Sequence, residues 1–264
     1  DVGLSLDAHH APSGRMTLDR LSVKARSVAF DGSAVLAADG LPEMIDIAGR
    51  LADPDGTPVL LPFGDSPIRV DRADFRLSGT SVAGQGWKAD IGIDGLTHAA
   101  ARIGRLSLSG SGRIGRAGGK SSVGGTLRLA ADDLIPVDAG LAAALGQDLR
   151  GGLRFHWLEG DGTLNLTGLD LAGDGFGATG ALQVQGLDSG LLTSGNLRLT
   201  AADLSRFSAL AGRPLGGSGL VVIEGSAGLL SGMLDGTADV SANGLTIAIE
   251  EVDSLLQGPS TARI

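Results

Sequence analysis

Apolar and polar residues alternate over most of the chain, the pattern of β-strands with one sheltered face. In each such segment Leu, Val, Ile, Ala or Phe side chains point one way, and Ser, Thr, Arg, Asp, Asn or Gln the other. The clearest examples are residues 68–71, 75–78, 89–94, 106–109, 164–167, 182–185 and 245–249. One-sided alternation is typical of antiparallel sheets. The sequence therefore predicts a mainly β fold built on an antiparallel sheet.

Turns and short helices are expected between these strands. Asp161-Gly162 and Asp235-Gly236 are typical of tight hairpin turns. Three segments have helical spacing over about two turns, at 138–145, 204–211 and 250–257, and in the first we expect Asp138 as the N-cap and Gly146 just after the last turn. Helices this short are not stable alone, so we expect them to dock on the sheet.

A strand-to-helix unit occurs twice, with an offset of 70 residues. Gly-x-Leu-x-Leu stands at 125–129 and again at 195–199, each followed by an Asp-Leu pair and an Ala/Leu-rich stretch. Repeated units that cannot bury their apolar face alone usually stack on their neighbours. We therefore expect 1–264 to be one continuous, elongated sheet segment of a longer protein. Its sub-units would be 1–124, 125–194 and 195–264.

Composition restricts the kind of ligand. The chain has 44 Gly, no Tyr, no Cys and a net charge of −9, and aromatic residues make up 3%. A negative chain is a poor partner for nucleic acid, which needs a basic surface. An apolar face of Leu, Val, Ile and Ala without aromatic residues suits flexible acyl chains, which need apolar contact but little fixed geometry.

Motifs for catalysis, cofactors and metals lack the context that they need. The glycine patterns at 110–115 and 175–180 resemble a dinucleotide fingerprint, but no helix is predicted after either. His9 and His10 could touch a metal, yet no other residue has ligand spacing, so exposed histidines are the favoured interpretation. The acidic pairs 132–133 and 250–251 are interpreted as helix-start residues rather than acid–base pairs. We expect a protein that is not an enzyme and that holds no cofactor or metal.

The strand-to-helix unit, the Leu-Ala-Gly-Arg-Pro-Leu-Gly-Gly-Ser-Gly segment at 210–219 and the Gly/Asp-rich Leu strands resemble the TamB family. TamB is the inner-membrane-anchored subunit of the bacterial translocation and assembly module, within the AsmA-like group. The resemblance is clearest over 120–264. It implies a curved, taco-like β-groove in the periplasm that carries phospholipid between the inner and outer membranes or assists outer-membrane protein assembly. The membrane anchor and the outer-membrane barrel partner would bind through regions outside this chain.

This interpretation predicts aliphatic residues that line a groove for phospholipid acyl chains. The candidates are Leu127, Leu129, Leu164, Leu166, Leu182, Val184, Leu197, Leu199, Ile247 and Ile249. The alternative is a closed β-solenoid or sandwich of a surface adhesin or secreted protein, in which the same residues form a sealed core. Alternation along the sequence does not separate an open groove from a sealed core.

Overall fold

A computed structural model describes residues 2–61, 66–81, 86–117, 119–160, 162–186, 191–228, 232–256 and 258–263. Within these residues the fold is mainly β, with 69% strand and 8% helix. The 17 strands form one open antiparallel sheet with a few short helices. The predicted fold class, a mainly β antiparallel sheet with short helices, is confirmed. Contacts divide the chain into two compact units, Asp1–Asp133 and Leu134–Ile264.

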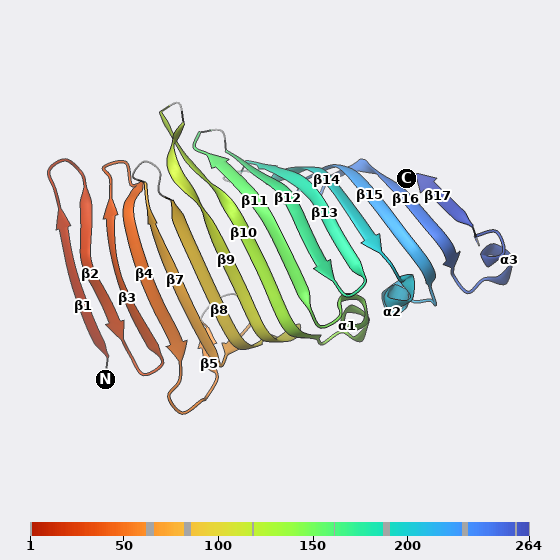
Figure 1. Ribbon diagram of the computed structural model, residues 1–264, viewed down its shortest axis with the longest axis horizontal. Helices are drawn as coiled ribbons and strands as arrows, with labels where there is room; N and C mark the ends of the chain where they lie inside the picture. Colours follow the sequence, from red (N-terminus) through yellow and green to blue (C-terminus); the bar gives the residue numbers. More distant parts are fainter. Residues whose placement is uncertain are drawn as a thin grey trace. The chain divides into compact units, whose positions relative to one another are not determined.

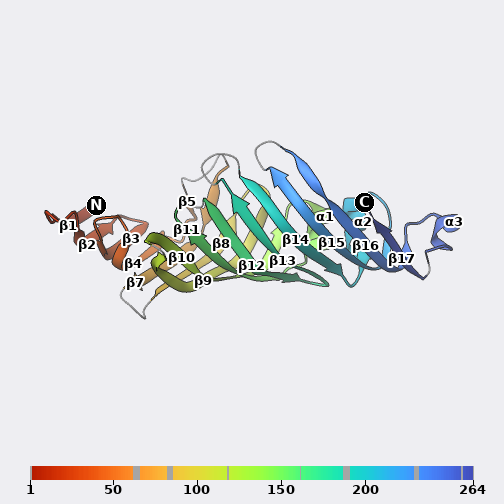
Figure 2. The same cartoon turned by 90° about the horizontal axis from the view of Figure 1, so that it is seen from above.

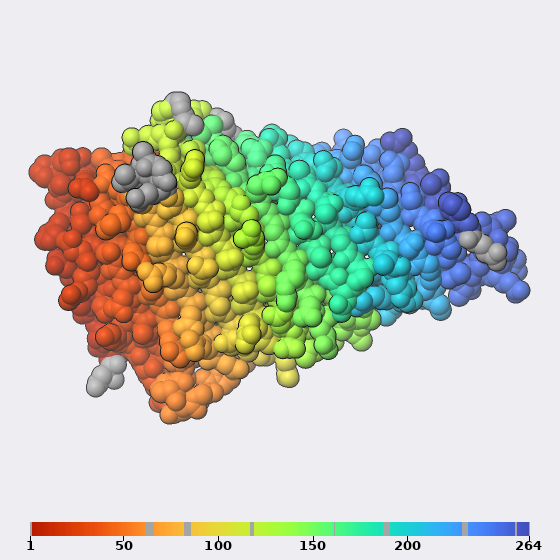
Figure 3. All heavy atoms as spheres, viewed as in Figure 1, coloured from red at the N-terminus to blue at the C-terminus, as the bar shows by residue number. Residues whose placement is uncertain are grey.

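The first unit holds the strands of the N-terminal half, and each hydrogen-bonds mainly to a neighbour in sequence (Figure 1). They are β1 (Gly3–His10), β2 (Met16–Lys24), β3 (Val28–Leu36), β4 (Pro42–Ala52), β5 (Val59–Leu61), β6 (Ile68–Val70), β7 (Arg72–Thr80), β8 (Trp87–Thr97) and β9 (Ala101–Ala117). β10 (Lys120–Pro136) carries the chain from the first unit into the second. The colours of Figure 3 therefore pass across this unit in bands that follow the sequence.

One excursion interrupts this order. β4 pairs with β7, while the small hairpin β5–β6 between them in sequence turns aside and reaches β8 through Arg69 and Thr97. Val70 of this hairpin is fully buried. Residues 53–58 connect β4 to this hairpin through a turn, where Asp53 accepts the N–H of Asp55 at 2.9 Å.

The second unit is a meander in which every strand from β11 to β17 pairs with the one before it. Its strands are β11 (Leu149–Leu158), β12 (Thr163–Gly173), β13 (Phe176–Gln185), β14 (Leu192–Ala201), β15 (Gly216–Gly228), β16 (Leu234–Thr246) and β17 (Pro259–Arg263). Its helical segments are α1 (Ala139–Leu145), η1 (Leu204–Phe207), α2 (Ser208–Ala211) and α3 (Glu250–Asp253). The three predicted helical segments are present, although α3 is shorter than the predicted 250–257.

Local chemistry explains where the helices begin and end. Asp138 accepts the N–H of Leu141 at 2.8 Å and is the N-cap of α1, as the sequence predicted. Gly212 ends α2 with φ 67° and ψ 15°, a left-handed conformation that glycine adopts without strain. α1 and α2 lie side by side at the ends of the strands (Figures 1 and 2), where Arg206 donates to the carbonyl of Ala143 at 3.1 Å.

Three local predictions are wrong. Asp235-Gly236 lies inside β16 and pairs with Ser226 and Gly225, so it is not a turn. The alternation at 245–249 does not continue as strand, because β16 ends at Thr246 and Ala248 takes a positive φ of 61°. Asp132-Asp133 lies inside β10 rather than at a helix start, and the helix cap is Asp138. Asp161 of the other predicted turn lies outside the described residues.

Few hydrophobic side chains of the described residues are buried. Across the described ranges, the hydrophobic residues classed as buried are Val35, Val70, Trp87, Ala131 and Ala144. The chain exposes 15,733 Å², whereas a compact protein of 26.4 kDa exposes about 10,600 Å². The described sheet is therefore largely a single layer, and its apolar face is covered only in places, as where Leu204 of η1 lies over Gly219 of β15.

Candidate functional site

The apolar face of the second unit carries a cavity of about 520 Å³ that spans four strands. It is lined by Leu182 of β13, residues 193–197 of β14, Ile223 and residues 225–227 of β15, and residues 234–238 of β16. This volume lies in the range of ordinary ligand pockets, about 300–1,000 Å³. Lining residues of β13 to β16 pair with one another from strand to strand. The cavity therefore runs across the strands rather than along one of them.

A row of glycines forms the floor of this cavity. Leu182 pairs with Gly195, Gly195 with Gly225, and Gly225 with Gly236, so three glycines lie side by side on adjacent strands. A Cβ placed on Gly195, Gly225 or Gly236 would meet a carbonyl oxygen of an adjacent strand at 2.1, 2.4 and 2.6 Å respectively. The backbones approach too closely here for a side chain, which leaves the floor as bare backbone.

Aliphatic side chains form the walls. In the next row Leu197 faces Gly180 on one side and Ile223 on the other, and Ile223 pairs with Ala238. Ile223 is 37% exposed and Leu234 is 86% exposed, because no element of the described second unit covers them. A flexible apolar chain placed across the glycine row would contact side chains on both flanks.

The opposite face of the same strands is polar, as the alternation predicts. Asn165 accepts a hydrogen bond from Gln183 at 3.0 Å, and Arg263 lies 3.3 Å from Asp239. His156 stands on this face, one residue from Phe155 and Trp157, which point to the apolar side. The two faces therefore differ sharply in chemistry, and the cavity lies on the apolar one.

The structure places most of the predicted lining residues on one face of their unit. In the second unit, Leu164 pairs with Val184 and Leu166 with Leu182, and Leu199 lies two residues from Leu197 on the same side of β14. Of these, Leu182 and Leu197 line the cavity itself. Leu127 and Leu129 belong to β10 in the first unit and are half-buried. Ile247 and Ile249 lie beyond the end of β16, where the N–H of Ile247 donates to Asp253 at 2.7 Å.

Sequence reasoning missed the glycine floor and two wall residues, Ile223 and Leu234. Ile223 lies in the apolar run 220–223, which does not alternate, so the sequence pattern does not assign its side chain to either face. The glycine row was harder to find, because its members are 30 and 11 residues apart and only the register aligns them. Gly236 was misassigned to a turn.

The apolar face of the first unit is more covered by its own aromatic side chains. The rings of Phe30 and Phe75 lie 5.9 Å apart over Gly49, where a Cβ would come within 2.3 Å of the Phe75 ring. Trp87 lies over the glycines of β9 and β10 and donates from Nε1 to the carbonyl of Gly124 at 3.2 Å. Glycines again allow this close approach, but here an aromatic ring occupies the space above them.

A larger hollow of about 800 Å³ lies on the polar face of the first unit. Its lining mixes charges of both signs, with Lys88 and Asp46 beside the ion pair of Arg15 and Glu43 at 2.7 Å. Although Val35, Met44 and Ile45 also line this hollow, its charged side chains would lie against an apolar ligand, so the cavity of the second unit is the better candidate for one.

Two carboxylates of the described residues have a lowered pKa, Asp203 at the start of η1 and Asp53 in a turn. The pKa of Asp203 is lowered because its carboxylate accepts hydrogen bonds from the hydroxyl and the N–H of Ser205. The pKa of Asp53 is lowered because it accepts the N–H of Asp55 and the hydroxyl of Ser27. Both carboxylates hold local structure, and neither lies at the apolar cavity.

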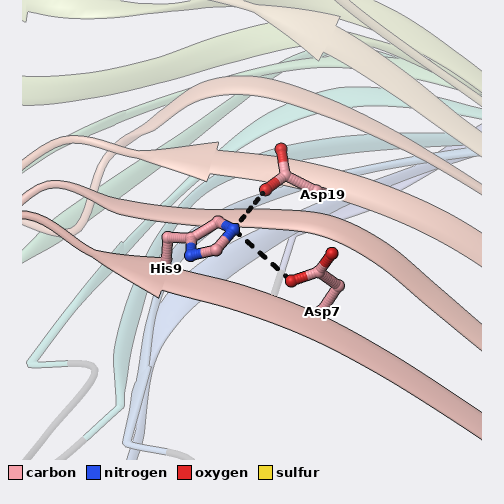
Figure 4. Close-up of side chains that lie close together, drawn as sticks. All are labelled: Asp7, His9 and Asp19. Carbon is pink, nitrogen blue, oxygen red and sulfur yellow. Dashed lines mark ion pairs between the residues drawn. The ribbon is translucent and has the colours of Figure 1, made fainter.

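Three side chains of the first unit that are able to bind a metal come together on the polar face. They are Asp7 and His9 of β1 and Asp19 of β2, and one ligand atom from each lies within 4.8 Å of the others (Figure 4). The sequence paired His9 with His10 as the metal candidate, but these two lie on opposite faces of β1. His9 instead faces two carboxylates.

Comparison with known proteins finds no relative. No family model matches the chain, and neither does any curated protein or any solved structure. Within the described residues, none of the helices has the length and apolar character needed to span a membrane.

Proposed function

We propose that this chain is a wall segment of a hydrophobic conduit in the bacterial envelope, and that its apolar face binds the acyl chains of phospholipids. The observation that carries the proposal is an aliphatic face left open to solvent, with a cavity of about 520 Å³ across β13 to β16. Apolar surface of this kind is favourable to bury and gives little preference for ligand geometry. Acyl chains match both properties.

The resemblance of the strand-to-helix unit to the TamB family supports a place in the periplasm. In this proposal the protein is anchored to the inner membrane and meets an outer-membrane barrel partner through regions outside this chain. It would carry phospholipid between the membranes, assist outer-membrane protein assembly, or do both. Neither role needs a catalytic group or a cofactor.

The alternative, a closed solenoid or sandwich of a surface adhesin, requires a second layer over the apolar face. The five buried hydrophobic residues of the described chain are too few for such a sealed core. The exposure of Ile223 and Leu234 also favours the open groove.

Site-specific photocrosslinking in the full-length protein in cells tests the proposal. A crosslinking residue replaces Leu182 or Ile223 on the apolar face, and matched controls replace Gln183 or Glu224, the next residue of the same strand on the opposite face. We expect phospholipid to be captured from the two apolar positions and not from the controls. Equal capture at all four positions, or no capture at any, contradicts an acyl-binding face.

A further inference from the structure

The hairpin of β1 and β2 gathers three metal-binding side chains on its polar face. Asp7 and His9 are two residues apart on β1, so their side chains point the same way. Asp19 comes from β2, the partner strand. Figure 4 shows the imidazole of His9 between the two carboxylates.

A β-bulge brings Asp19 to this position. Asp7 pairs with Arg20 and Ala8 pairs with Leu18, so Asp19 is the extra residue of β2. The same irregularity appears on the other side of β2, between Leu18 and Leu21. Bulges re-aim side chains and are found next to functional sites more often than elsewhere.

The distances leave room for an ion. Nε2 of His9 lies 3.4 Å from Oδ1 of Asp7 and 3.3 Å from Oδ2 of Asp19. Good N–H···O hydrogen bonds are shorter, about 2.7–3.2 Å. In a tetrahedral site with metal–ligand bonds of about 2.0–2.1 Å, neighbouring ligand atoms lie roughly 3.3–3.4 Å apart. The two distances from His9 match this tetrahedral edge, and the two carboxylate oxygens lie within 4.8 Å of each other.

The charges at the cluster differ from those on the rest of the polar face. Several acids elsewhere in the first unit pair with arginines across strands, as Asp46 does with Arg76 at 3.4 Å and Asp94 with Arg105 at 3.4 Å. In the described part of the chain, the one ion-pair partner of Asp7 and Asp19 is His9. Two carboxylates against one imidazole leave an excess of negative charge, which a divalent cation neutralises.

We propose that Asp7, His9 and Asp19 bind a divalent transition-metal ion of the zinc class, which ties β1 to β2. One imidazole and two carboxylates suit such ions, whereas magnesium and calcium prefer sites made of oxygen alone. All eight residues of β1 are exposed, so side-chain packing contributes little to the stability of this strand. A metal ion bound between β1 and β2 would stabilise their pairing. The site is separate from the acyl-binding face, because it lies on the polar side of the sheet.

Calorimetric titration of the tag-free chain with Zn²⁺ tests this site. We expect one ion per chain with micromolar affinity. Loss of an outer partner of a metal ligand typically weakens binding by about 10–100-fold, so His9→Gln and Asp19→Asn should each weaken it at least that much. His10→Gln, next in β1 but on the opposite face, is the matched control and should bind as the wild type does.

Hydrogen exchange gives a second measurement that also reports folding. In the wild type, Zn²⁺ should slow the exchange of the β1 amides, while Mg²⁺ at the same concentration should not. The same measurement on His9→Gln without metal shows whether the hairpin has kept its fold. The proposal is overturned if the wild type takes up no Zn²⁺, or if His9→Gln binds it as tightly as His10→Gln does.

Discussion

Replacing Leu197 with arginine is the sharpest test of the apolar face. Leu197 lies on β14 between Gly180 and Ile223 and lines the cavity. It is only half-buried, so a guanidinium at this position can reach water by bending its long side chain outward. The fold should therefore survive, while a charge now stands in the wall that an acyl chain must contact.

The expected loss follows from the contact area. Burying a leucine side chain completely contributes about 1.5–3 kcal/mol, so a wall residue touched on one side contributes roughly 1 kcal/mol. Covering a charged or polar group without a partner adds about 1–3 kcal/mol. Leu197→Arg should therefore weaken acyl binding by at least about 2 kcal/mol, which is roughly 30-fold.

Displacement of a fluorescent fatty acid measures this affinity, and urea unfolding checks the fold. The control is Leu192→Arg, the same substitution in the same strand, at a 45% exposed position on the opposite face. If the control weakens binding as much as Leu197→Arg does, or if Leu197→Arg binds within threefold of the wild type, the cavity is not the acyl site.

Three further predictions concern the fold and can be checked by urea unfolding. Gly112→Ala should lower the free energy of unfolding by about 1–3 kcal/mol, because the added Cβ would lie 1.9 Å from a carbonyl oxygen of β10. Gly115→Ala is the control, since nothing lies within 4 Å of its Cβ position, and it should change the free energy of unfolding by less than about 0.5 kcal/mol. Asp138→Ala removes the N-cap of α1 and should cost about 1 kcal/mol, which Asp138→Ser recovers. The pKa of Asp203 is lowered by its bonds to Ser205, so its stabilising effect is present above its usual value of 3.8 and is lost as the pH falls through the folded value. The stability difference between wild type and Asp203→Asn should therefore shrink from pH 7 to pH 3, and a constant difference contradicts this cause.

The alternation of apolar and polar residues along the sequence was enough to predict the sheet and its two faces. Alternation at 164–167 and 182–185 put Leu166 and Leu182 on the same face, and the register pairs them directly. Capping chemistry placed α1, since the Asp138 side chain and Gly146 mark its two ends. These features depend on residues close together in sequence, which is why the sequence carries them.

Features that depend on register could not be predicted in this way. The cavity floor exists because β14, β15 and β16 align their glycines, and a shift of one residue in any pairing would break the row. The bulge at Asp19 is of the same kind, because no local signal marks it as the extra residue of β2. Asp235-Gly236 shows the opposite error, since a local turn signal was overridden by pairing with β15.

The pairing of each strand from β11 to β17 with its chain neighbours has a consequence for how such a protein can evolve. In a compact domain an inserted hairpin must fit a core that many distant residues have already shaped. In this meander a duplicated hairpin needs only two matching edges, because each strand contacts the strand before it and the strand after it. Gene duplication can therefore lengthen the unit one hairpin at a time and leave the existing strands unchanged.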